Sequence, residues 1–574
     1  MRSRREFVRT GLQALLLGLL RRPAMATVLS GDSNSEWIPP GLAGSRPFFR
    51  LPQQRPSVMV GGFPFADGFF GDPWPYSRIP FHSGENNFPG GEPPAPTETV
   101  DVAIVGGGLS GLATAYFLRH RRPVVLELRS RFGGVSQGET WDGTHYSLGG
   151  AYFITPDPGS FLEDFYRELG LEDVQRLSPG GDDPMELNGI IHDDFWSGAG
   201  LPPAEAQAIL RYAEIVNTFA NESYPDIPLD ESQDNDWILA LDSRTLKADL
   251  EERLGMAVPP LLAAGIQSYC YSSFNAGWDS LSAAAGWNFI AAEEYGRWVC
   301  PGGNAWVTDA LWQRLVRAYS HPARAHHLDR LRPDTRAVDV RLAANDRVQL
   351  TYKDAQGVFH SLLAKRVVMA CSKHIAKYVI RDLQDIDPDK LNAMHSVATN
   401  PYVVVNVLLD APIAASFYDV FLLGNGDFPM SETQAEAHSR VVDVINARYA
   451  RPGPSSRSVL TLYWPLPWVW AKFSLIDSDT AWQDYASRLA PQVASLLSIL
   501  NVPRSAVKQV RMTRWGHSMP VAAPGFIANG TAQHVRRPFQ GRVYFVNQDN
   551  WALPAFETCV LEAKTWSDEI DASL

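Results

Sequence analysis

The hydrophobic pattern is clearest at residues 100–134, which read VDVAIVGGGLSGLATAYFLRHRRPVVLELRSRFGG. An apolar run comes first, followed by a glycine-rich turn, an Ala/Leu-rich stretch and a second apolar run. Short apolar runs bounded by glycine predict buried strands, and the Ala/Leu-rich stretch predicts a helix. The segment therefore predicts a strand, a helix and a strand in the order of a βαβ unit.

Further elements are expected later in the chain. A helix should follow the sequence PGGNAW at 301–306 and run through Leu315, and a strand is expected near Val338. The apolar run at 440–445 also predicts a strand. Near the end of the chain, residues 541–549 predict a strand, and a helix should begin near Phe556.

Residues 27–98 form an arm that is rich in proline and glycine and has neither a helical nor a strand period, so irregular backbone is expected. Its aromatic content is too high for a solvated linker, and much of the arm should pack along the folded body. A lid or a partner surface is the alternative. The aromatic residues are Trp37, Phe48, Phe49, Phe63, Phe65, Phe69, Phe70, Trp74, Tyr76, Phe81 and Phe88.

Residues 1–26 have the layout of a cleavable export signal. A basic start precedes an apolar run at 11–20 and the small-x-small sequence Ala24-Met25-Ala26. The apolar run is too short to remain as a membrane span. Residues 3–9, SRREFVR, resemble the twin-arginine export motif. The resemblance implies the twin-arginine export machinery as a partner, a cofactor inserted before export, and the periplasm as the destination.

Composition narrows the function classes. The chain has 574 residues, of which 45% are hydrophobic and 20% charged, as expected for a soluble protein with two domains. The formal net charge is −12 and the basic residues are scattered, so no nucleic-acid partner is expected. The four cysteines have no zinc-binding spacing, so no metal is expected and the thiols should be mostly buried.

The glycine-rich turn has the spacing of a dinucleotide-binding site. Gly106 permits a tight turn, Gly108 lets a pyrophosphate approach the backbone, and Gly111 allows close packing of helix and strand. The start of the helix faces the phosphate charge. Glu127, at the end of the second strand, is placed to accept hydrogen bonds from ribose hydroxyls.

The next residues resemble the flavin amine oxidase and phytoene desaturase superfamily. Residues 128–134, LRSRFGG, are similar to that superfamily's RxRxGG continuation, and 146–152, YSLGGAY, are similar to its GG-containing turn near the flavin ring. The resemblance implies FAD rather than NAD. Motif and resemblance together place the following residues at FAD: Gly106, Gly108, Ser110, Gly111, Glu127, Arg129, Gly133, Gly134, Gly149, Gly150, Ala151 and Val338, with 301–306 and Val338 on the adenine side.

The resemblance returns at the C-terminal end of the chain. It implies that Asp549 approaches the ribityl chain or the pyrophosphate, and that the backbone amides near Phe556 and Glu557 point toward the flavin O2. A helix N-terminus would stabilise the negative charge that reduced flavin carries near N1 and O2. For the Glu557 side chain alone, a solvated carboxylate at the start of a helix is an equal alternative.

The expected fold class is α/β: a Rossmann-type FAD-binding domain interleaved with a mixed α+β substrate domain, as in amine oxidases. The substrate cavity is expected where the two domains meet over the flavin. The FAD-binding domain is assigned to 99–155, 300–375 and 505–574, and the substrate domain to 156–299 and 376–504.

The sequence departs from amine oxidases at three places. Asn406 stands where the family carries a lysine near flavin N5, which favours a dehydrogenase that passes electrons to an acceptor other than oxygen. The family's two substrate-framing aromatic rings have no counterpart at Ala555 or near 520–521. Lys472 could replace the missing lysine, although a solvated cation is the simpler interpretation.

His517 is the leading acid/base candidate because imidazole titrates near neutral pH, with a packing histidine as an equal alternative. Trp551 is a candidate for covering the flavin or lining the cavity, with an ordinary core position as its alternative. With few catalytic side chains required, Asn406, His517 and Trp551 complete the candidate set.

Three functions compete. The leading hypothesis is an FAD-dependent dehydrogenase or oxidase of an amine or amino-acid-like small molecule, with hydride transfer to flavin N5. The second is a desaturase or isomerase of an apolar isoprenoid-like substrate. The third is a flavin-binding protein without turnover. No permanent membrane span is expected in the mature chain.

Overall fold

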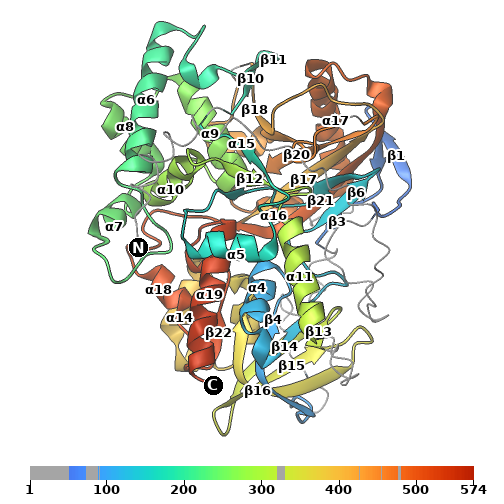
Figure 1. Cartoon of the computed structure of the whole chain (residues 1–574), viewed down its shortest axis with the longest axis vertical. Coiled ribbons are helices and arrows are strands. Elements are labelled where there is room, and N and C mark those ends of the chain that lie inside the picture. The colour runs from blue at the N-terminus through green and yellow to red at the C-terminus, as the bar shows by residue number, and fades with distance from the viewer. Residues whose placement is uncertain are drawn as a thin grey trace, which may run out of the picture.

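The computed structural model describes residues 51–72, 88, 91–181, 183–319, 330–425, 427–453, 455–475 and 480–574. The proposed export signal lies outside this range, as do residues 27–50, 73–87 and 89–90 of the arm, which include Trp37, Phe48, Phe49, Trp74, Tyr76 and Phe81. Two large sheets, each covered by helices, form two lobes (Figure 1).

The first lobe contains a seven-stranded sheet. Its order is β13-β5-β4-β16-β15-β14, and β22 pairs with β16 beside β15. Strands β13, β5, β4, β16 and β22 are parallel, whereas β14 and β15 are antiparallel additions. The strands are β4 (Glu98–Val105), β5 (Val124–Leu126), β13 (Leu331–Arg332), β14 (Arg336–Ala343), β15 (Arg347–Lys353), β16 (Phe359–Met369) and β22 (Val543–Phe545).

The βαβ unit expected from residue 100 onward is confirmed. The apolar run becomes β4, the Ala/Leu-rich stretch becomes α4 (Leu109–Phe117), and the second run becomes β5. Val102 and Ile104 are fully buried, as are Ala103 and Val125, because helices cover both faces of a parallel sheet. Helices α11 (Ala305–Tyr319) and α19 (Phe556–Ala572) pack against α4 (Figure 1), and both begin where the sequence indicated.

The second lobe contains a ten-stranded sheet of order β1-β2-β21-β17-β20-β19-β18-β10-β11, with β3 also paired to β21. Strands β21, β17, β20, β19 and β18 form an antiparallel series. The strands are β1 (Ser57–Val60), β2 (Phe63–Ala66), β3 (Phe70–Gly71), β10 (Met185–Leu187), β11 (Ile190–His192), β17 (Thr399–Leu409), β18 (Asp419–Gly424), β19 (Asp443–Asn446), β20 (Ser458–Pro465) and β21 (Val507–Pro520).

Helices surround this second sheet, and two small sheets link it to the first lobe. The small sheets are β6 (Gly138–Trp141) with β7 (Thr144–Ser147), and β8 (Phe153–Ile154) with β12 (Arg297–Val299) and β9 (Arg176–Ser178). Within the described residues, no helix is both long and apolar enough to cross a membrane. The remaining α-helices are α5 (Phe161–Leu169), α6 (Pro203–Asn221), α7 (Asp236–Asp242), α8 (Leu246–Leu254), α9 (Pro260–Phe274), α10 (Ala283–Glu293), α12 (Lys373–Val379), α13 (Leu383–Ile386), α14 (Pro388–Ser396), α15 (Glu432–Ala437), α16 (Ala471–Ser474), α17 (Ala481–Ile499) and α18 (Thr531–Arg536).

The expectation of irregular backbone in the arm is wrong for residues 57–71. Strands β1 and β2 form a hairpin around Gly61 and Gly62, whose φ angles of 58° and 87° suit a two-residue hairpin turn. Phe63 and Phe65 alternate onto the buried face of β2, and both are fully buried. The expectation that arm aromatics pack on the body is therefore confirmed at these positions and at Phe88, which is 6% exposed.

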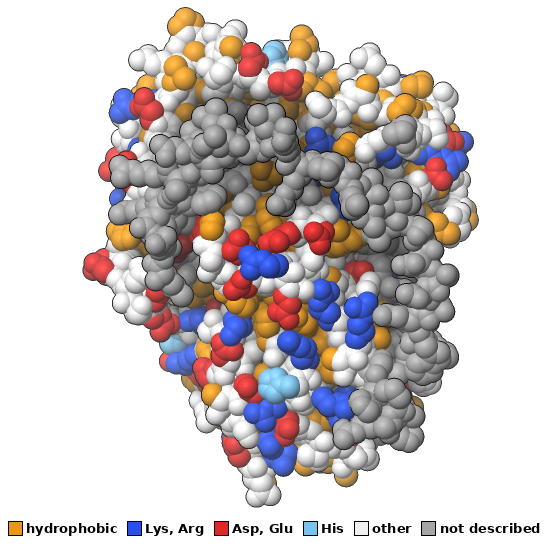
Figure 2. Space-filling model, viewed as in Figure 1, with side chains coloured by type: hydrophobic (Ala, Val, Ile, Leu, Met, Phe, Trp, Pro, Cys, Tyr) orange, Lys and Arg blue, Asp and Glu red, His pale blue; other side chains and the backbone are white. Residues whose placement is uncertain are grey.

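Strand β21 lies in the sheet of the second lobe. It comes from the segment assigned to the FAD-binding domain, yet it pairs with β17, from the segment assigned to the substrate domain. The division of the chain into two domains stays a prediction. On the face drawn in Figure 2, acidic and basic side chains are interspersed among the described residues rather than gathered into a patch of one sign.

Candidate active site

The turn between β4 and α4 has the geometry that a pyrophosphate needs. The N–H of Gly106 (φ 111°) donates to Leu126 O at 2.8 Å. A Cβ on Gly111 would lie 1.9 Å from Gly106 O, so only glycine permits this packing. Gly108 is the N-cap residue of α4, which has no side-chain cap and no acidic residue in its first turn. The N–H groups at the start of α4 thus remain available to an anion.

Glu127 closes one end of this turn. Its Oε2 accepts a hydrogen bond from Gly107 N at 2.8 Å, and its Oε1 accepts one from Arg129 N at 2.9 Å. Burial raises the pKa of the Glu127 carboxyl, and the charge of Arg129 together with the two amide donors counteracts that effect. The carboxylate keeps further lone pairs that could accept ribose hydroxyls.

The Arg129 guanidinium turns away from this end. It forms an ion pair with Asp72 at the end of β3, and it lies 4.8 Å from the centre of the Trp515 ring. Asp72 also accepts a hydrogen bond from Gly516 N at 2.7 Å. Asp72 of the arm therefore pairs with the Arg129 guanidinium, and Arg129 acts on the turn both through its backbone N–H and through its charge, which lowers the pKa of Glu127.

Two further glycine pairs, 133–134 and 149–150, belong to the predicted FAD-binding residues. Gly133 N donates to Gly107 O at 2.8 Å, and Gly134 packs closely against the backbone of Gly108. In the turn at 147–152, a Cβ on Gly149 would lie 1.9 Å from Val135 O. The segment at 301–306 packs here, since Asn304 N donates to Gly150 O at 3.1 Å.

The C-terminal helix meets the first turn directly. Helix α19 packs against α4, and Ser110 of α4 lies close enough to the Cys559 thiol to lower its pKa, although burial raises that pKa overall. Helix α19 has Ala555 as N-cap and no side-chain cap, so its first N–H groups are also available. Glu557 Oε1 accepts a hydrogen bond from Ile154 N at 2.7 Å, which fixes the start of α19 beside the 147–152 turn.

Phe556 and Asp549 are two further residues that the sequence assigns to FAD. Phe556 is 6% exposed and stacks on Phe153 with ring centres 4.9 Å apart. Asp549 is 2% exposed, and its Oδ2 accepts a hydrogen bond from Lys373 N at 2.8 Å. A carboxylate is thus held rigidly between the start of α12 and the loop that follows β22.

Val338 and Ala151 are two further residues that the sequence assigns to FAD, and their place in the site stays a prediction. Val338 lies at the irregularity in the β14·β15 register between Ala337 and Asp339, where it has no Cα partner. Its backbone is therefore outside the regular ladder. Ala151 is 7% exposed, and its Cα would be 2.6 Å from a Cβ on Gly303.

A family model described as "Flavin containing amine oxidoreductase" matches residues 109–545. This match covers most of the chain and spans both lobes. The chain belongs to this family. FAD is accordingly its cofactor, and the family is one of oxidoreductases.

Relatives of known activity match only short segments of the chain. Oxidoreductase PigB of Serratia sp. (strain ATCC 39006) is 37% identical over 95 residues, which are 16% of this chain and 13% of PigB. Putrescine oxidase of Kocuria rosea is 35% identical over 111 residues, 19% of this chain and 22% of that enzyme. The 15-cis-phytoene desaturase of Capsicum annuum is 35% identical over 83 residues, 14% of each chain. The chain therefore aligns with less than a quarter of each of these three relatives.

Solved structures show the same fold over a longer range. Wild-type putrescine oxidase bound to putrescine aligns with a TM-score of 0.58 at 17% identity, covering 83% of this chain and 100% of that one. Cyclohexylamine oxidase from Brevibacterium oxydans IH-35A aligns with a TM-score of 0.58 at 16% identity, covering 83% and 99%. The expected α/β flavoenzyme fold is thereby confirmed.

The residues of this family member fit FAD along the whole path. Two helix N-termini without side-chain caps, α4 and α19, converge where Ser110 meets Cys559. Gly108 and Gly134 pack backbone to backbone, and a Cβ on Gly134 would lie 3.1 Å from Gly108 Cα. Such a site provides N–H donors for the pyrophosphate and a carboxylate for the ribose.

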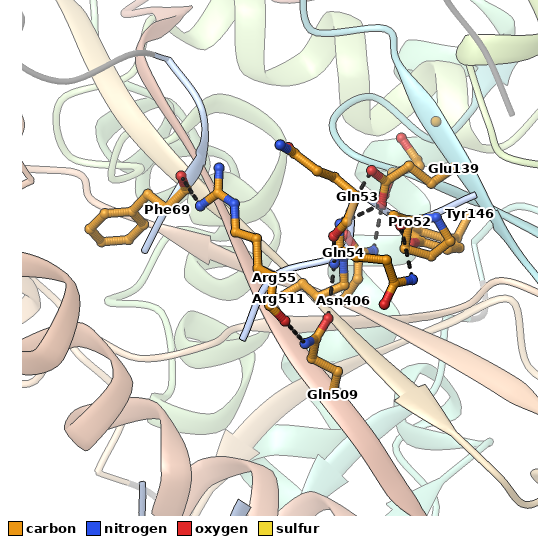
Figure 3. Close-up of polar contacts among 12 residues, drawn as sticks. Pro52, Gln53, Gln54, Arg55, Phe69, Glu139, Tyr146, Asn406, Gln509 and Arg511 are labelled. Atoms are coloured by element: carbon orange, nitrogen blue, oxygen red, sulfur yellow. Dashed lines mark hydrogen bonds and ion pairs between the residues drawn. The ribbon is translucent and has the colours of Figure 1, made fainter. Parts of the chain in front are cut away.

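Asn406, the residue at the expected lysine position, lies in the core of β17. Its side-chain amide donates to Ser147 O at 3.0 Å and to Thr461 Oγ1 at 2.9 Å, and it is fully buried. Figure 3 shows Asn406 close to Tyr146, Glu139 and Arg511. Asn406 thus holds the 147–152 turn in place through its hydrogen bond to Ser147 O.

His517 lies on β21, with its Nδ1 2.7 Å from Thr399 Oγ1. Its ring stacks on His374, with centres 4.5 Å apart. Burial, together with Lys377 and Lys472, lowers the pKa of His374 to about 4, so His374 is neutral at pH 7. Lys472 of α16 is therefore close to this pair.

Trp551 lies in the core, 2% exposed. Its indole N–H donates to Glu562 Oε1 at 2.7 Å, and the Arg536 guanidinium lies 4.8 Å from its ring centre. Glu562 also accepts the Trp566 indole N–H at 2.9 Å. These contacts anchor the loop carrying Asp549 to α19.

The sequence analysis missed a group of tyrosines at the 147–152 turn. Tyr463 donates its hydroxyl to Gly149 O at 2.6 Å. The Tyr402 ring lies 5.6 Å from the Tyr463 ring at 85°. Tyr152 belongs to the turn itself. Tyr402 lies on β17 and Tyr463 on β20. Their contact depends on the pairing of these two strands, which the sequence alone does not give.

A cavity of about 1020 Å³ opens beside these segments, between the arm and the first lobe. Leu148 borders it next to the 147–152 turn, and Arg129 borders it next to Glu127. Its other lining residues include Arg55, Phe70, Asp72, Arg131, Gln137, Glu139, Arg336, Arg514 and Trp515.

Proposed function

We propose that this protein oxidises an amine or amino-acid-like donor, with hydride transfer from the donor to flavin N5. The supporting observation is the gathering of Tyr152, Tyr402 and Tyr463 at the 147–152 turn. Aromatic faces attract ammonium groups and pack on carbon chains. Bound FAD supplies the hydride acceptor. The chain holds the donor beside the turn and limits the access of water.

His517 is proposed to take the proton that the donor must lose. An amine is oxidised in its neutral form, so the ammonium must transfer a proton as it binds. Thr399 holds Nδ1 of His517, which fixes the orientation of the ring. Because His374 stays uncharged at neutral pH, it does not repel a proton from His517.

The proposed electron acceptor is one other than oxygen. The amide of Asn406 is engaged by Ser147 O and Thr461, so this position offers no ammonium group near the flavin. The proposal therefore favours a dehydrogenase over an oxidase. Reduction of the protein by its donor should be followed by slow reoxidation in air and faster reoxidation by a soluble dye acceptor, compared in a stopped-flow spectrometer.

The second candidate is a desaturase or isomerase of an apolar isoprenoid-like substrate. Its support is the similarity of a short segment to phytoene desaturase. The tyrosine hydroxyls and the buried carboxylates close to the 147–152 turn favour the amine, since such groups are costly to leave beside a purely apolar ligand. A flavin-binding protein without turnover is the remaining alternative.

The donor class can be tested by mixing purified yellow protein with amines under anaerobic conditions. The flavin absorption band should bleach with at least one amine, and His517→Gln should slow bleaching at neutral pH while rate is regained at high pH, where solvent removes the proton. Failure of all amines to bleach the flavin, with bleaching by an apolar polyene, would reject the amine proposal in favour of the desaturase.

We further propose export through the twin-arginine machinery to the periplasm. Arg4 and Arg5, which lie outside the described residues, are its basis. The double variant R4K/R5K should leave yellow, unprocessed protein in the cytoplasm of a bacterial host that carries this machinery, as measured by fractionation. The matched pair R21K/R22K should still be exported. Periplasmic recovery of R4K/R5K at the unchanged level would contradict the proposal.

A further inference from the structure

A basic pocket of about 430 Å³ lies in the first lobe, at the end of the parallel sheet where β4 begins. It is bordered by β4, by the chain that follows α4, and by residues of β15 and β16. Asp101 is the one acidic residue of its described wall. The cationic residues of this wall are Arg121, Arg122, Arg330, Arg347 and Lys365. Such a wall attracts anions.

The pocket is separate from the predicted FAD site. Gly106 follows the opposite end of β4, five residues after Asp101. A strand rises about 3.3 Å per residue, so the pocket and the glycine turn lie about 17 Å apart along β4. The described wall of the pocket contains none of the residues that the sequence assigns to FAD. An anion bound here is therefore not the pyrophosphate of FAD.

Carboxylates of the protein balance two of the five positive charges. Lys365 Nζ lies 2.8 Å from Asp101 Oδ1, on the neighbouring strand. Arg121 Nε lies 2.6 Å from Asp571 Oδ1, near the end of α19. These two cations are thus paired within the chain.

The other three cations are paired weakly or not at all. Arg330 Nη1 lies 3.5 Å from Glu98 Oε1, and the other oxygen of this carboxylate already binds Arg332 at 2.7 Å. Arg122 and Arg347 form no ion pair with any residue that the structure describes. The pocket therefore carries positive charge that the described chain does not balance.

Arg122 and Tyr319 also leave buried hydrogen-bonding groups unused. Arg122 Nε and Nη2 are buried and have no hydrogen-bond partner among the described residues, and the same holds for the hydroxyl of Tyr319, which is 1% exposed. Burial raises the pKa of Tyr319, and the charges of Arg330 and Arg122 oppose that effect, so both guanidinium groups lie near the hydroxyl. Buried polar groups are nearly always hydrogen-bonded in folded proteins, so this cluster indicates a missing acceptor.

Arg122 is held in a backbone conformation that disfavours arginine. Its φ and ψ are both 56°, in the left-handed region, where only Gly, Asn and Asp are common. Strained positions of this kind persist where the surrounding structure fixes them, and they are frequent at ligand sites. Asparagine should therefore suit the backbone at this position better than arginine does.

We propose that Arg122, Arg330 and Arg347 bind a phosphate group in this pocket. The guanidinium fork matches the oxygens of a phosphate, and a doubly charged anion balances the surplus positive charge. The volume of about 430 Å³ is in the range of small-molecule sites. The phosphate group belongs either to a soluble molecule or to a lipid headgroup. This binding site is independent of the donor that the flavin oxidises.

The test titrates inorganic phosphate into FAD-saturated holoprotein by isothermal titration calorimetry, with sodium chloride holding the ionic strength constant. Saturation with FAD occupies the proposed pyrophosphate site at α4, so the added phosphate reports on other sites. Arg122→Asn should weaken phosphate binding at least about tenfold. Arg122→Lys should weaken it less, because lysine keeps the charge but loses the fork. Arg167→Gln removes an exposed arginine of α5 and is the matched control, with wild-type affinity expected.

Thermal unfolding of the same holoproteins separates a lost site from a damaged fold. In phosphate-free buffer, Arg122→Asn should melt at or above the wild-type temperature, because asparagine tolerates the left-handed conformation. Added phosphate should raise the melting temperature of the wild type and of Arg167→Gln, and it should leave that of Arg122→Asn unchanged.

Vesicles of phosphatidylcholine and phosphatidylglycerol distinguish the two sources of the phosphate group. Cosedimentation of the wild type with these vesicles, lost in Arg122→Asn, would assign the group to a lipid headgroup. Phosphate binding without cosedimentation would assign it to a soluble molecule. If the wild type shows no saturable binding of phosphate or vesicles, or if Arg122→Asn binds them with wild-type affinity, the proposal is overturned and the pocket is a solvated basic surface.

Discussion

Gly108→Ala should yield a folded protein that has lost most of its flavin. Gly108 has φ −75° and ψ −171°, which any residue can adopt. The added methyl would lie 3.6 Å from Gly134 Cα, an ordinary contact, so the protein itself should tolerate it. The methyl would instead occupy the start of α4, where the pyrophosphate approaches the backbone. We expect at least about a tenfold loss of FAD affinity.

The measurement is the ratio of flavin to protein absorbance after gel filtration, followed by titration of the apoprotein with FAD. Gly111→Ala is less informative, because its Cβ would collide with Gly106 O and disturb the fold as well as the site. The control is Gly143→Asn in the β6–β7 turn, where nothing lies within 4 Å and asparagine tolerates the φ of 78°. Wild-type FAD affinity in Gly108→Ala would place the pyrophosphate elsewhere.

The dinucleotide site could be read from the sequence because its geometry is local. Gly106, Gly108, Gly111 and Glu127 lie within one βαβ unit, and the turn conformation itself requires glycine. The start of α19 could likewise be located from its own residues. That α19 meets α4 was inferred from the family resemblance alone, and the structure shows the two helices packed together.

The substrate side could not be read in the same way, because it depends on long-range pairing. Tyr402 and Tyr463 meet because β17 pairs with β20. The aromatic rings of this chain do not stand at Ala555 or near 520–521, where the family resemblance places them. Tyr402 and Tyr463 come from different segments, and only the strand register brings them to the turn.

The arm gives the clearest failure of pattern reading, and its signal was present. The sequence VMVGGFPF places a glycine pair between two short runs, a recognised indication of a hairpin. Pro64 within the second run and the many nearby prolines obscured it. Strand β2 tolerates this proline because its pairing with β21 is limited to Phe65 and Val510.

Phe65→Ala should destabilise the whole protein strongly. The Phe65 side chain is fully buried in the core of the second lobe. Removing a buried phenylalanine costs about 3–5 kcal/mol, because the cavity collapses only partly. The loss should appear as a lower urea midpoint, followed by tryptophan fluorescence. It should also loosen the flavin site, because the arm holds β21 through Asp72 and Gly516.

Val58→Ala provides the matched control for this hairpin. Val58 is the Cα partner of Phe65 on β1, yet it is 37% exposed, so its truncation should cost less than about 1 kcal/mol. Comparing Phe65→Ala with Val58→Ala distinguishes two interpretations of the arm. If it is an integral part of the ten-stranded sheet, the two variants should differ by several kcal/mol. If it were a detachable cover, both variants would unfold at the wild-type midpoint, because losing the hairpin would leave the sheet intact. Arg511 favours the first interpretation, because it forms a buried ion pair with Glu139 at 3.1 Å and also donates to Gln53 O, in the part of the arm just before the hairpin.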